Sequence, residues 1–287
     1  MRKIFNNNQF AIVVSMFATI LIAILLSMSF AIPSVVYASD DSVGEIFYAA
    51  TGSARKETET FSYVTKTTES YSINISFPNY YNTNTSLQNT CANVAGANII
   101  GYFDRYFENL IPNVTPGAGK TKYTYYAMTR NMAEKQAVIN DLYVRMQTNV
   151  DRDGNTQTQY KNGITSYVQS KGLAVSYNAV MTNGQFDLNK AKAQFQAGNP
   201  ISLYMSGYGF ANITDNGSLV TLDKNIYDDN HIAIAYGYEK VDYCNSHGGL
   251  LRSVIYLKVA TGLQGVSGVY VVNNYGKLND AEAVCIK

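Results

Sequence analysis

The sequence predicts an α+β fold in which a helical half precedes an antiparallel sheet. Residues 91–200 carry apolar side chains at helical spacings, whereas the chain beyond Pro200 consists of short β-branched and aromatic runs separated by Gly, Asn and Asp. Helices that come first and strands that come second are typical of an α+β domain, because an alternating α/β fold would mix the two along the chain.

Composition narrows the class of protein. The chain has 287 residues with 22 Lys+Arg against 21 Asp+Glu, so it lacks the basic surplus that nucleic-acid binding requires. Apolar and aromatic residues are frequent enough for a folded core. With 3 Cys, 2 His and no close Cys/His cluster, we expect no metal site and no cofactor.

Residues 1–38 have the three parts of a secretory signal. Arg2 and Lys3 precede a long uncharged run, which ends in Pro33 and the small residue Ala38. We expect cleavage after Ala38 and a near-neutral secreted or cell-surface protein. The uncharged run is also long enough to span a bilayer, so an uncleaved membrane anchor is the alternative.

The mature chain divides into a leader and one domain. Residues 39–75 are rich in Ser, Thr, Glu and Lys without a sustained apolar period, which predicts a flexible leader or a short pro-segment with little core. Residues 76–287 form the expected domain, which we expect to be a monomer.

Four helices are expected before the sheet. The first starts at or just before Cys91 and stops before Pro112, and the others cover about 131–147, 160–171 and 186–197. In the first helix a single apolar face is expected to enter the core, formed by Ala95, Ile99, Tyr102, Phe103, Tyr106 and Leu110. The strands follow in the runs ISLYMSG, SLVTL, HIAIAYGYEKV, RSVIYLKVAT and VSGVYVVNNY.

A polar stretch between the second and third helices resembles the start of a calcium loop. Its sequence is Asp151-Arg152-Asp153-Gly154-Asn155, but the twelfth position would be Asn162 rather than Glu. We therefore interpret it as a polar turn between helices.

Three residues could together form a nucleophilic site. Cys91 stands in the first turn of a helix, where the positive end of the helix dipole favours the thiolate. His231 opens an apolar strand and could accept the thiol proton, while Asn273, at the end of a later strand, could orient the imidazole.

In this order and spacing the chain resembles the papain-like cysteine peptidases. NTCANVAGANIIGYFDRY is similar to the nucleophile helix of the bacterial branch related to double-glycine leader peptidases and streptopain, and NHIAIAYGYEK is similar to the histidine strand of that branch. YVVNNYG is similar to the strand end that carries the orienting Asn, which places it at Asn273 with Asn274 as fallback. The resemblance implies a Cys91–His231–Asn273 triad and a papain-like fold over about residues 76–277.

The chain departs from the family pattern near the nucleophile. Ala92 stands where the family has Gly, and the glutamine of the oxyanion hole has its counterpart in Gln88, three residues before Cys91. The Cys91 N–H would be the first oxyanion donor, and Gln88, Asn84 or Asn89 could be the second.

The remaining cysteines raise the question of a disulfide. Outside the cell an odd thiol is either bridged to another chain or kept for its reactivity. Among three possible pairings we favour Cys244 with Cys285, which leaves Cys91 free. His247, in a Gly-rich turn, is expected to be an exposed loop residue.

We therefore expect a secreted cysteine endopeptidase, a hydrolase that forms an acyl-thioester on Cys91 and acts on protein or peptide substrates. Two alternatives stay open: an acyltransferase that uses the same triad, and a catalytically silent binding protein on a papain-like frame. No nucleic acid is expected as a partner, and a membrane only if the signal stays uncleaved.

Overall fold

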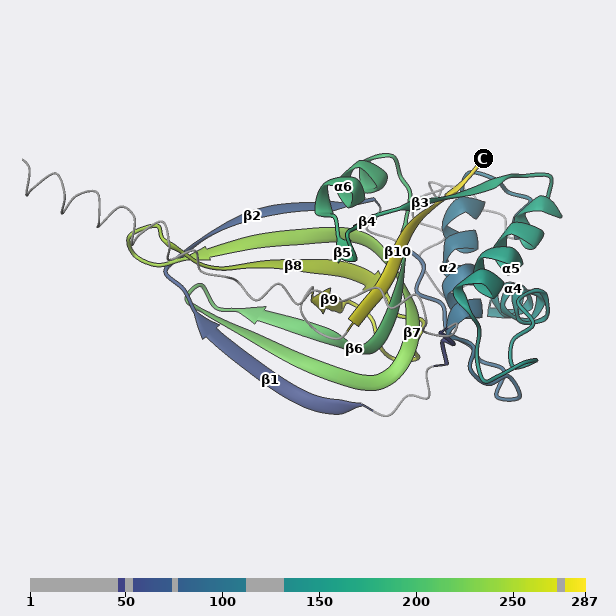
Figure 1. Cartoon of the computed structure of the whole chain (residues 1–287), viewed down its shortest axis with the longest axis horizontal. Coiled ribbons are helices and arrows are strands. Elements are labelled where there is room, and N and C mark those ends of the chain that lie inside the picture. Colours follow the sequence, from purple (N-terminus) through teal and green to yellow (C-terminus); the bar gives the residue numbers. More distant parts are fainter. Residues whose placement is uncertain (1–45, 50–53, 74–76, 112–131, 273–276) are drawn as a thin grey trace, which may run out of the picture. The chain divides into compact units, whose positions relative to one another are not determined.

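The structure is a computed structural model and describes residues 46–49, 54–73, 77–111, 132–272 and 277–287. The signal segment expected at 1–38 lies outside these residues. Within the described part of the chain, no helix is both long and apolar enough to cross a membrane. The described residues combine helices with an antiparallel sheet, as the α+β prediction requires (Figure 1).

Four helices lie close to the ranges that the sequence predicts. They are α2 (Cys91–Asp104), α4 (Met132–Arg145), α5 (Gln157–Gln169) and α6 (Leu188–Gln196). Side-chain caps stabilise the N-termini of two of these helices. Thr156 and Gln159 form a capping box at the start of α5. Asp187 accepts hydrogen bonds from two backbone N–H groups at the start of α6. The polar stretch from Asp151 is a turn between α4 and α5.

Helix α2 ends earlier than the apolar spacing predicts. Its last residue is Asp104, whose carboxylate accepts a bond of 2.7 Å from the N–H of Ile111 and so closes a turn. Because the chain leaves the helix direction there, Tyr106 is 47% exposed, and its expected place in the core is wrong.

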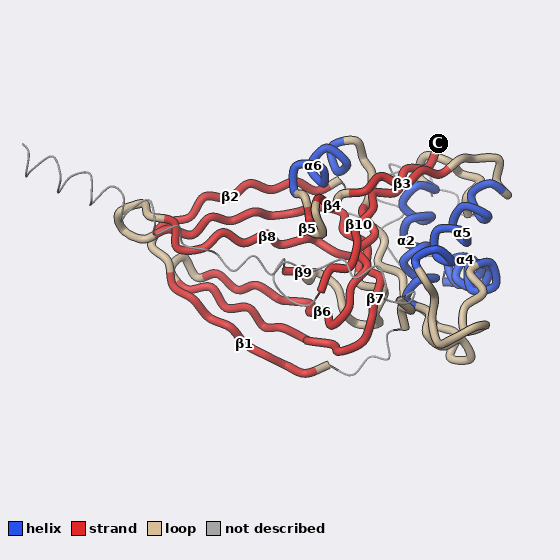
Figure 2. The backbone as a smooth tube through the Cα atoms, in the orientation of Figure 1, coloured by secondary structure: helices blue, strands red, loops and turns tan. Residues whose placement is uncertain are grey.

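The main sheet has eight strands, and every pairing in it is antiparallel (Figure 2). Its order is β1-β7-β8-β9-β6-β10-β3, and β2 also pairs with β7. A separate two-stranded sheet pairs β4 with β5. The strands are β1 (Arg55–Ser62), β2 (Thr65–Ser72), β3 (Val175–Ala179), β4 (Met181–Thr182), β5 (Gln185–Phe186), β6 (Ile201–Asp215), β7 (Leu219–Cys244), β8 (Leu250–Ala260), β9 (Tyr270–Val272) and β10 (Lys277–Ile286).

Strand β7 organises this sheet because it pairs with different neighbours along its 26 residues. Its first part lies between β1 and β6, and its last part lies between β2 and β8. Between these parts the run His231–Ala235 pairs with the start of β6. The middle of β7 thus places His231 deep in the molecule.

The expectation of a flexible leader at 39–75 is wrong for the residues that form strands β1 and β2. Both strands pair with β7 over all eight of their residues, and Figure 1 shows them at opposite outer edges of the sheet. Their side chains are mostly exposed Thr, Lys, Glu and Ser, so they carry no apolar alternation from which a strand could be predicted.

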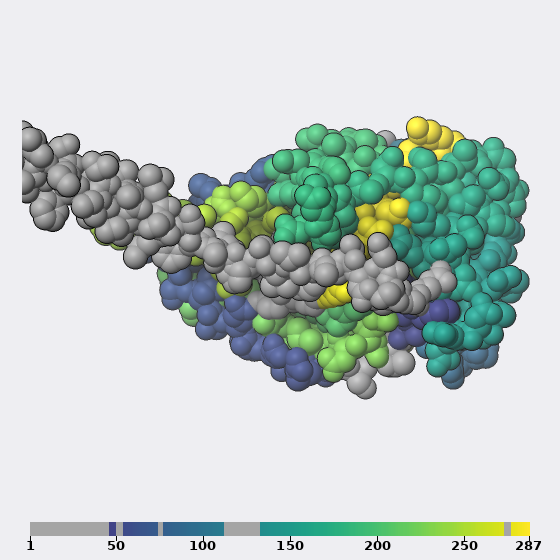
Figure 3. All heavy atoms as spheres, viewed as in Figure 1, coloured from purple at the N-terminus to yellow at the C-terminus, as the bar shows by residue number. Residues whose placement is uncertain are grey.

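Strand β10 was not predicted either, although it lies between β6 and β3. Its residues Ala281, Ala283 and Val284 are fully buried. On the face shown in Figure 3, the C-terminal residues in yellow appear as small patches, the larger ones beside residues coloured teal.

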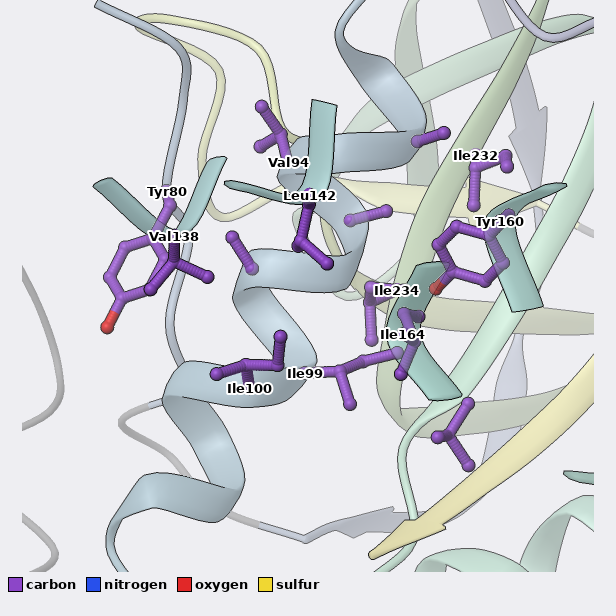
Figure 4. Packing of buried hydrophobic residues seen from close by; sticks show 14 of the residues in the cluster. Tyr80, Val94, Ile99, Ile100, Val138, Leu142, Tyr160, Ile164, Ile232 and Ile234 are labelled. Carbon is purple, nitrogen blue, oxygen red and sulfur yellow. The ribbon is translucent and has the colours of Figure 1, made fainter. Parts of the chain in front are cut away.

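The largest core surrounds α2. Every residue of this helix is buried, whereas the sequence predicted only one apolar face. Side chains from α4, α5 and β7 close around it, as Figure 4 shows for Leu142, Ile164 and Ile232. A helix enclosed on all sides holds Cys91, its first residue, in a fixed position.

This close packing leads to a prediction about two glycines of α2. A Cβ at Gly101 would lie 2.5 Å from the ring of Tyr80, whereas one at Gly96 would meet the flexible end of Leu142 at 3.0 Å. We expect Gly101→Ala to lower the free energy of unfolding by about 1–3 kcal/mol through overpacking. Gly96→Ala is the matched control, and we expect a change below about 1 kcal/mol because the helix propensity of Ala offsets a mild contact. Urea unfolding followed by circular dichroism measures both, and equal stability of the two variants would contradict the packing argument.

Candidate active site

Cys91 is the first residue of α2, and its thiol is covered by a peptide carbonyl. The Cys91 Sγ donates a hydrogen bond of 3.4 Å to the backbone oxygen of Tyr48, and the cysteine is only 6% exposed. The first turn of α2 contains no acidic residue that would oppose the helix dipole. A thiol that donates to a carbonyl carries its proton, so the cysteine is neutral in this state.

His231 lies in the middle of β7 and is completely buried. Its Nε2 is 2.7 Å from the carbonyl oxygen of Thr261, and a carbonyl can only accept. The neutral imidazole therefore carries its proton on Nε2, which leaves the lone pair on Nδ1. Nδ1 has no hydrogen-bond partner in the described part of the chain.

Aromatic rings hold the imidazole in place. Tyr208 stacks on it with ring centroids 4.7 Å apart, and Phe210 meets it edge-on at 5.8 Å. Burial lowers the pKa of His231 to about 4, although the Thr261 carbonyl and Asp229 act in the opposite direction. The imidazole is therefore neutral at physiological pH and able to accept a proton.

Three observations bring the surroundings of Cys91 and His231 together. The side chain of Asn230 donates a bond of 2.8 Å to the carbonyl of Phe47, and the thiol of Cys91 donates to the next carbonyl, that of Tyr48. Tyr208, which stacks on His231, also interacts electrostatically with Cys91, and its pKa is raised chiefly by burial and further by this cysteine.

The third observation concerns the loop after β8. A Cβ at Gly262 would lie 3.1 Å from Val94, so this loop packs on the first turn of α2. The side chain of Asn79 accepts a bond of 3.0 Å from the N–H of Thr261 and donates one of 3.0 Å to the carbonyl of Val266. Asn79 thereby positions the carbonyl that orients His231.

The expected orienting residue Asn273 and its fallback Asn274 lie outside the described residues. Within those residues, the Thr261 carbonyl already occupies Nε2 of His231. The sequence could not point to this group, because a backbone carbonyl is present at every residue.

The residues predicted as the second oxyanion donor contact other groups. Gln88 is exposed, and its own backbone oxygen accepts a bond of 3.2 Å from the side chain of Asn149. Asn89 donates its amide to Asn149 at 3.0 Å, and Asn84 accepts bonds from Ser86. The N-terminal N–H groups of α2 remain the best-placed donors beside the thiol.

The three cysteines are separate thiols, so the pairing of Cys244 with Cys285 is not formed. Cys244 ends β7 opposite Thr65, whereas Cys285 lies in β10 opposite Ser176. Strands β7 and β10 are not neighbours in the sheet, so the two thiols are not brought together. His247 lies in an exposed turn, as expected.

The described residues contain no group of three or more His, Cys, Asp or Glu side chains that could hold a metal ion. No family model matches the chain, and no curated protein matches it. The interpretation of the site therefore depends on its own residues and their geometry.

The buried imidazole predicts a specific loss of stability with falling pH. The unfolded chain binds a proton at His231 near pH 6.5, whereas the folded chain does so only near pH 4, so stability falls as pH drops between these values. Between pH 6.5 and 5 we expect a loss of about 1.5 kcal/mol in the free energy of unfolding. Urea titrations at several pH values measure it.

The matched controls are His231→Gln and His247→Gln. We expect the first to remove most of this pH dependence, because Gln does not titrate, and the second to retain it. An unchanged pH dependence in His231→Gln would show that the folded histidine titrates normally.

Proposed function

We propose that the protein is a secreted cysteine endopeptidase of papain-like fold that cleaves extended peptides through an acyl-thioester on Cys91. The observation that carries the proposal is the thiol of Cys91 at the beginning of a buried helix, in contact with a peptide carbonyl, while Tyr208 interacts both with this cysteine and with an imidazole whose Nδ1 lone pair is available. Nucleophile, base and peptide group are the three components that acyl transfer requires.

The reaction follows from these groups. With a substrate carbonyl in place, His231 Nδ1 takes the thiol proton while Cys91 Sγ bonds to the carbonyl carbon. The negative charge moves to the carbonyl oxygen, where the N-terminal N–H groups of α2 stabilise it. His231 then gives the proton to the leaving amine, and water releases the acyl group from sulfur with the same histidine as base.

The group proposed to orient His231 differs from that of the expected triad, because it is the Thr261 carbonyl rather than the side chain of Asn273. The Thr261 carbonyl, 2.7 Å from Nε2, fixes the tautomer that leaves Nδ1 free and stabilises the imidazolium that forms during the reaction. Asn273 remains a candidate for further support of His231.

A second candidate is a catalytically silent binding protein on the same frame. It is favoured by the complete burial of His231 and by its pKa of about 4, because a weakly basic imidazole and a protonated thiol do not form a reactive ion pair.

Cleavage of a reduced, denatured protein distinguishes the candidates. We expect Cys91→Ala to lower the cleavage rate at least about a hundredfold, because the variant removes the proposed nucleophile. Cys285→Ala is the matched control, since this thiol lies in a strand away from the site, and it should cleave as the unaltered chain does. Equal cleavage by Cys91→Ala and the unaltered chain would disprove the peptidase, and incorporation of an added amine into the product would assign acyl transfer instead.

A further inference from the structure

Residues 46–49 are bound in the candidate site in the manner of an extended peptide. The N–H of Tyr48 donates a bond of 2.8 Å to the carbonyl of Asn155, and the N–H of Asn155 donates one of 3.2 Å back to the carbonyl of Tyr48. This antiparallel pair is the contact by which a peptide adds to the edge of a protein backbone. Asn155 is itself fully buried and held by bonds to Met146 and Thr148.

The protein backbone leaves room for the peptide group at this point. A Cβ at Gly154 would lie 2.1 Å from the carbonyl oxygen of Tyr48 and 2.6 Å from its carbonyl carbon. Gly154 also has a φ of +88°, which side-chain-bearing residues rarely adopt. Glycine at this position therefore permits the close approach of residue 48 to Asn155.

The side chain of Tyr48 fills a closed space beside the thiol. It is 2% exposed, and its ring lies 5.7 Å from that of Tyr204. Its hydroxyl is 3.5 Å from Nδ2 of Asn279, and Oδ1 of Asn279 has no hydrogen-bond partner among the described residues. The space around Tyr48 thus combines the aromatic ring of Tyr204 with the side-chain amide of Asn279. A tyrosine side chain fits both, because it has an aromatic ring and a hydroxyl group that can donate a hydrogen bond.

Neighbouring groups complete the contacts with this segment. The guanidinium of Arg152 lies 5.4 Å from the ring centroid of Phe47, and the side chain of Asn230 holds the Phe47 carbonyl. The Tyr48 carbonyl meets the Cys91 thiol, so the segment occupies the position that a substrate carbonyl would need.

We infer that residues 46–49 are an internal ligand that covers Cys91, and that the same site accepts in their place an extended peptide with a tyrosine in the position of Tyr48. The second half of this inference rests on the proposed function, because it assigns a substrate class to that site. The first half stands on the contacts alone.

The test measures the reaction of Cys91 with iodoacetamide in the full chain, with peptide mass spectrometry to identify the labelled thiols. We expect Tyr48→Ala to raise the labelling rate of Cys91 at least about tenfold, because the segment loses its buried anchor. Tyr71→Ala, at a 37% exposed tyrosine of β2, is the matched control and should leave the rate unchanged. Labelling of Cys244 and Cys285 reports general unfolding, so only a rise confined to Cys91 supports the inference.

A second variant protects the test against a folding defect in Tyr48→Ala. Gly154→Ala keeps Tyr48 but forces its carbonyl away, and we expect the same selective rise at Cys91. Unchanged Cys91 labelling in both variants would overturn the covering role.

The substrate class is tested by competition. The hexapeptide Glu-Ile-Phe-Tyr-Ala-Ala, which reproduces residues 45–50, should slow Cys91 labelling in Tyr48→Ala, whereas the same peptide with Ala in place of Tyr should not. Equal protection by both peptides, or by neither, would overturn the tyrosine site. A chain whose Cys91 is uncovered and protected by the first peptide, yet cleaves no protein, would instead disprove the proposed peptidase and leave the internal ligand standing.

Discussion

The complete burial of helix α2 is the constraint on which the rest of the structure depends. A helix with no solvent-facing side must place its polar residues against groups that bond to them. Asn93 donates to Thr148 at 2.9 Å, Asn98 accepts from the N–H of Tyr80 at 2.6 Å, and Asp104 closes the following turn. The loop before the helix, which carries Asn79, and the turn between α4 and α5, which carries Asn155, are thereby tied to it, and both residues position the rest of the site.

The site combines strong burial with little fixed charge. Thr261 offers His231 a carbonyl rather than a carboxylate, which selects one tautomer and stabilises the imidazolium less than a charged partner would. Cys91 is likewise held as a neutral thiol by the Tyr48 carbonyl. Proton transfer from Cys91 to His231 is thus disfavoured while residues 46–49 cover the thiol. Replacement of these residues by another peptide would change the relative stability of the neutral and the ionised forms.

The helices, the place of Cys91 at a helix start and the place of His231 in an apolar strand could be predicted from the sequence because they depend on local pattern. Apolar spacing marks α2 and α5, and His231 stands at the start of the apolar part of β7. Strands β1 and β2 could not be predicted, because their exposed Thr, Lys and Glu side chains show no apolar alternation. Their backbones pair with β7, which lies far away in the sequence.

The parts of the site that could not be predicted are backbone groups and approaches made possible by glycine. The carbonyls of Thr261 and Tyr48 have no residue type that identifies them, and the role of Gly154 depends on a segment that lies about a hundred residues earlier in the chain. Tyr106 was predicted to lie on the buried face of the first helix because its spacing fits that face. The helix ends at Asp104, before this residue, so the prediction was wrong.

The pairing of early strands with late ones has a consequence for synthesis. Strands β1 and β2 leave the ribosome long before β7, their shared partner, and Tyr48 precedes both Asn155 and Asn230, which hold its segment. Contacts of such high sequence separation form late and slowly. The nascent chain must therefore keep two unpaired strands soluble, and their Thr, Lys and Glu side chains suit this task because charged, polar strands resist aggregation.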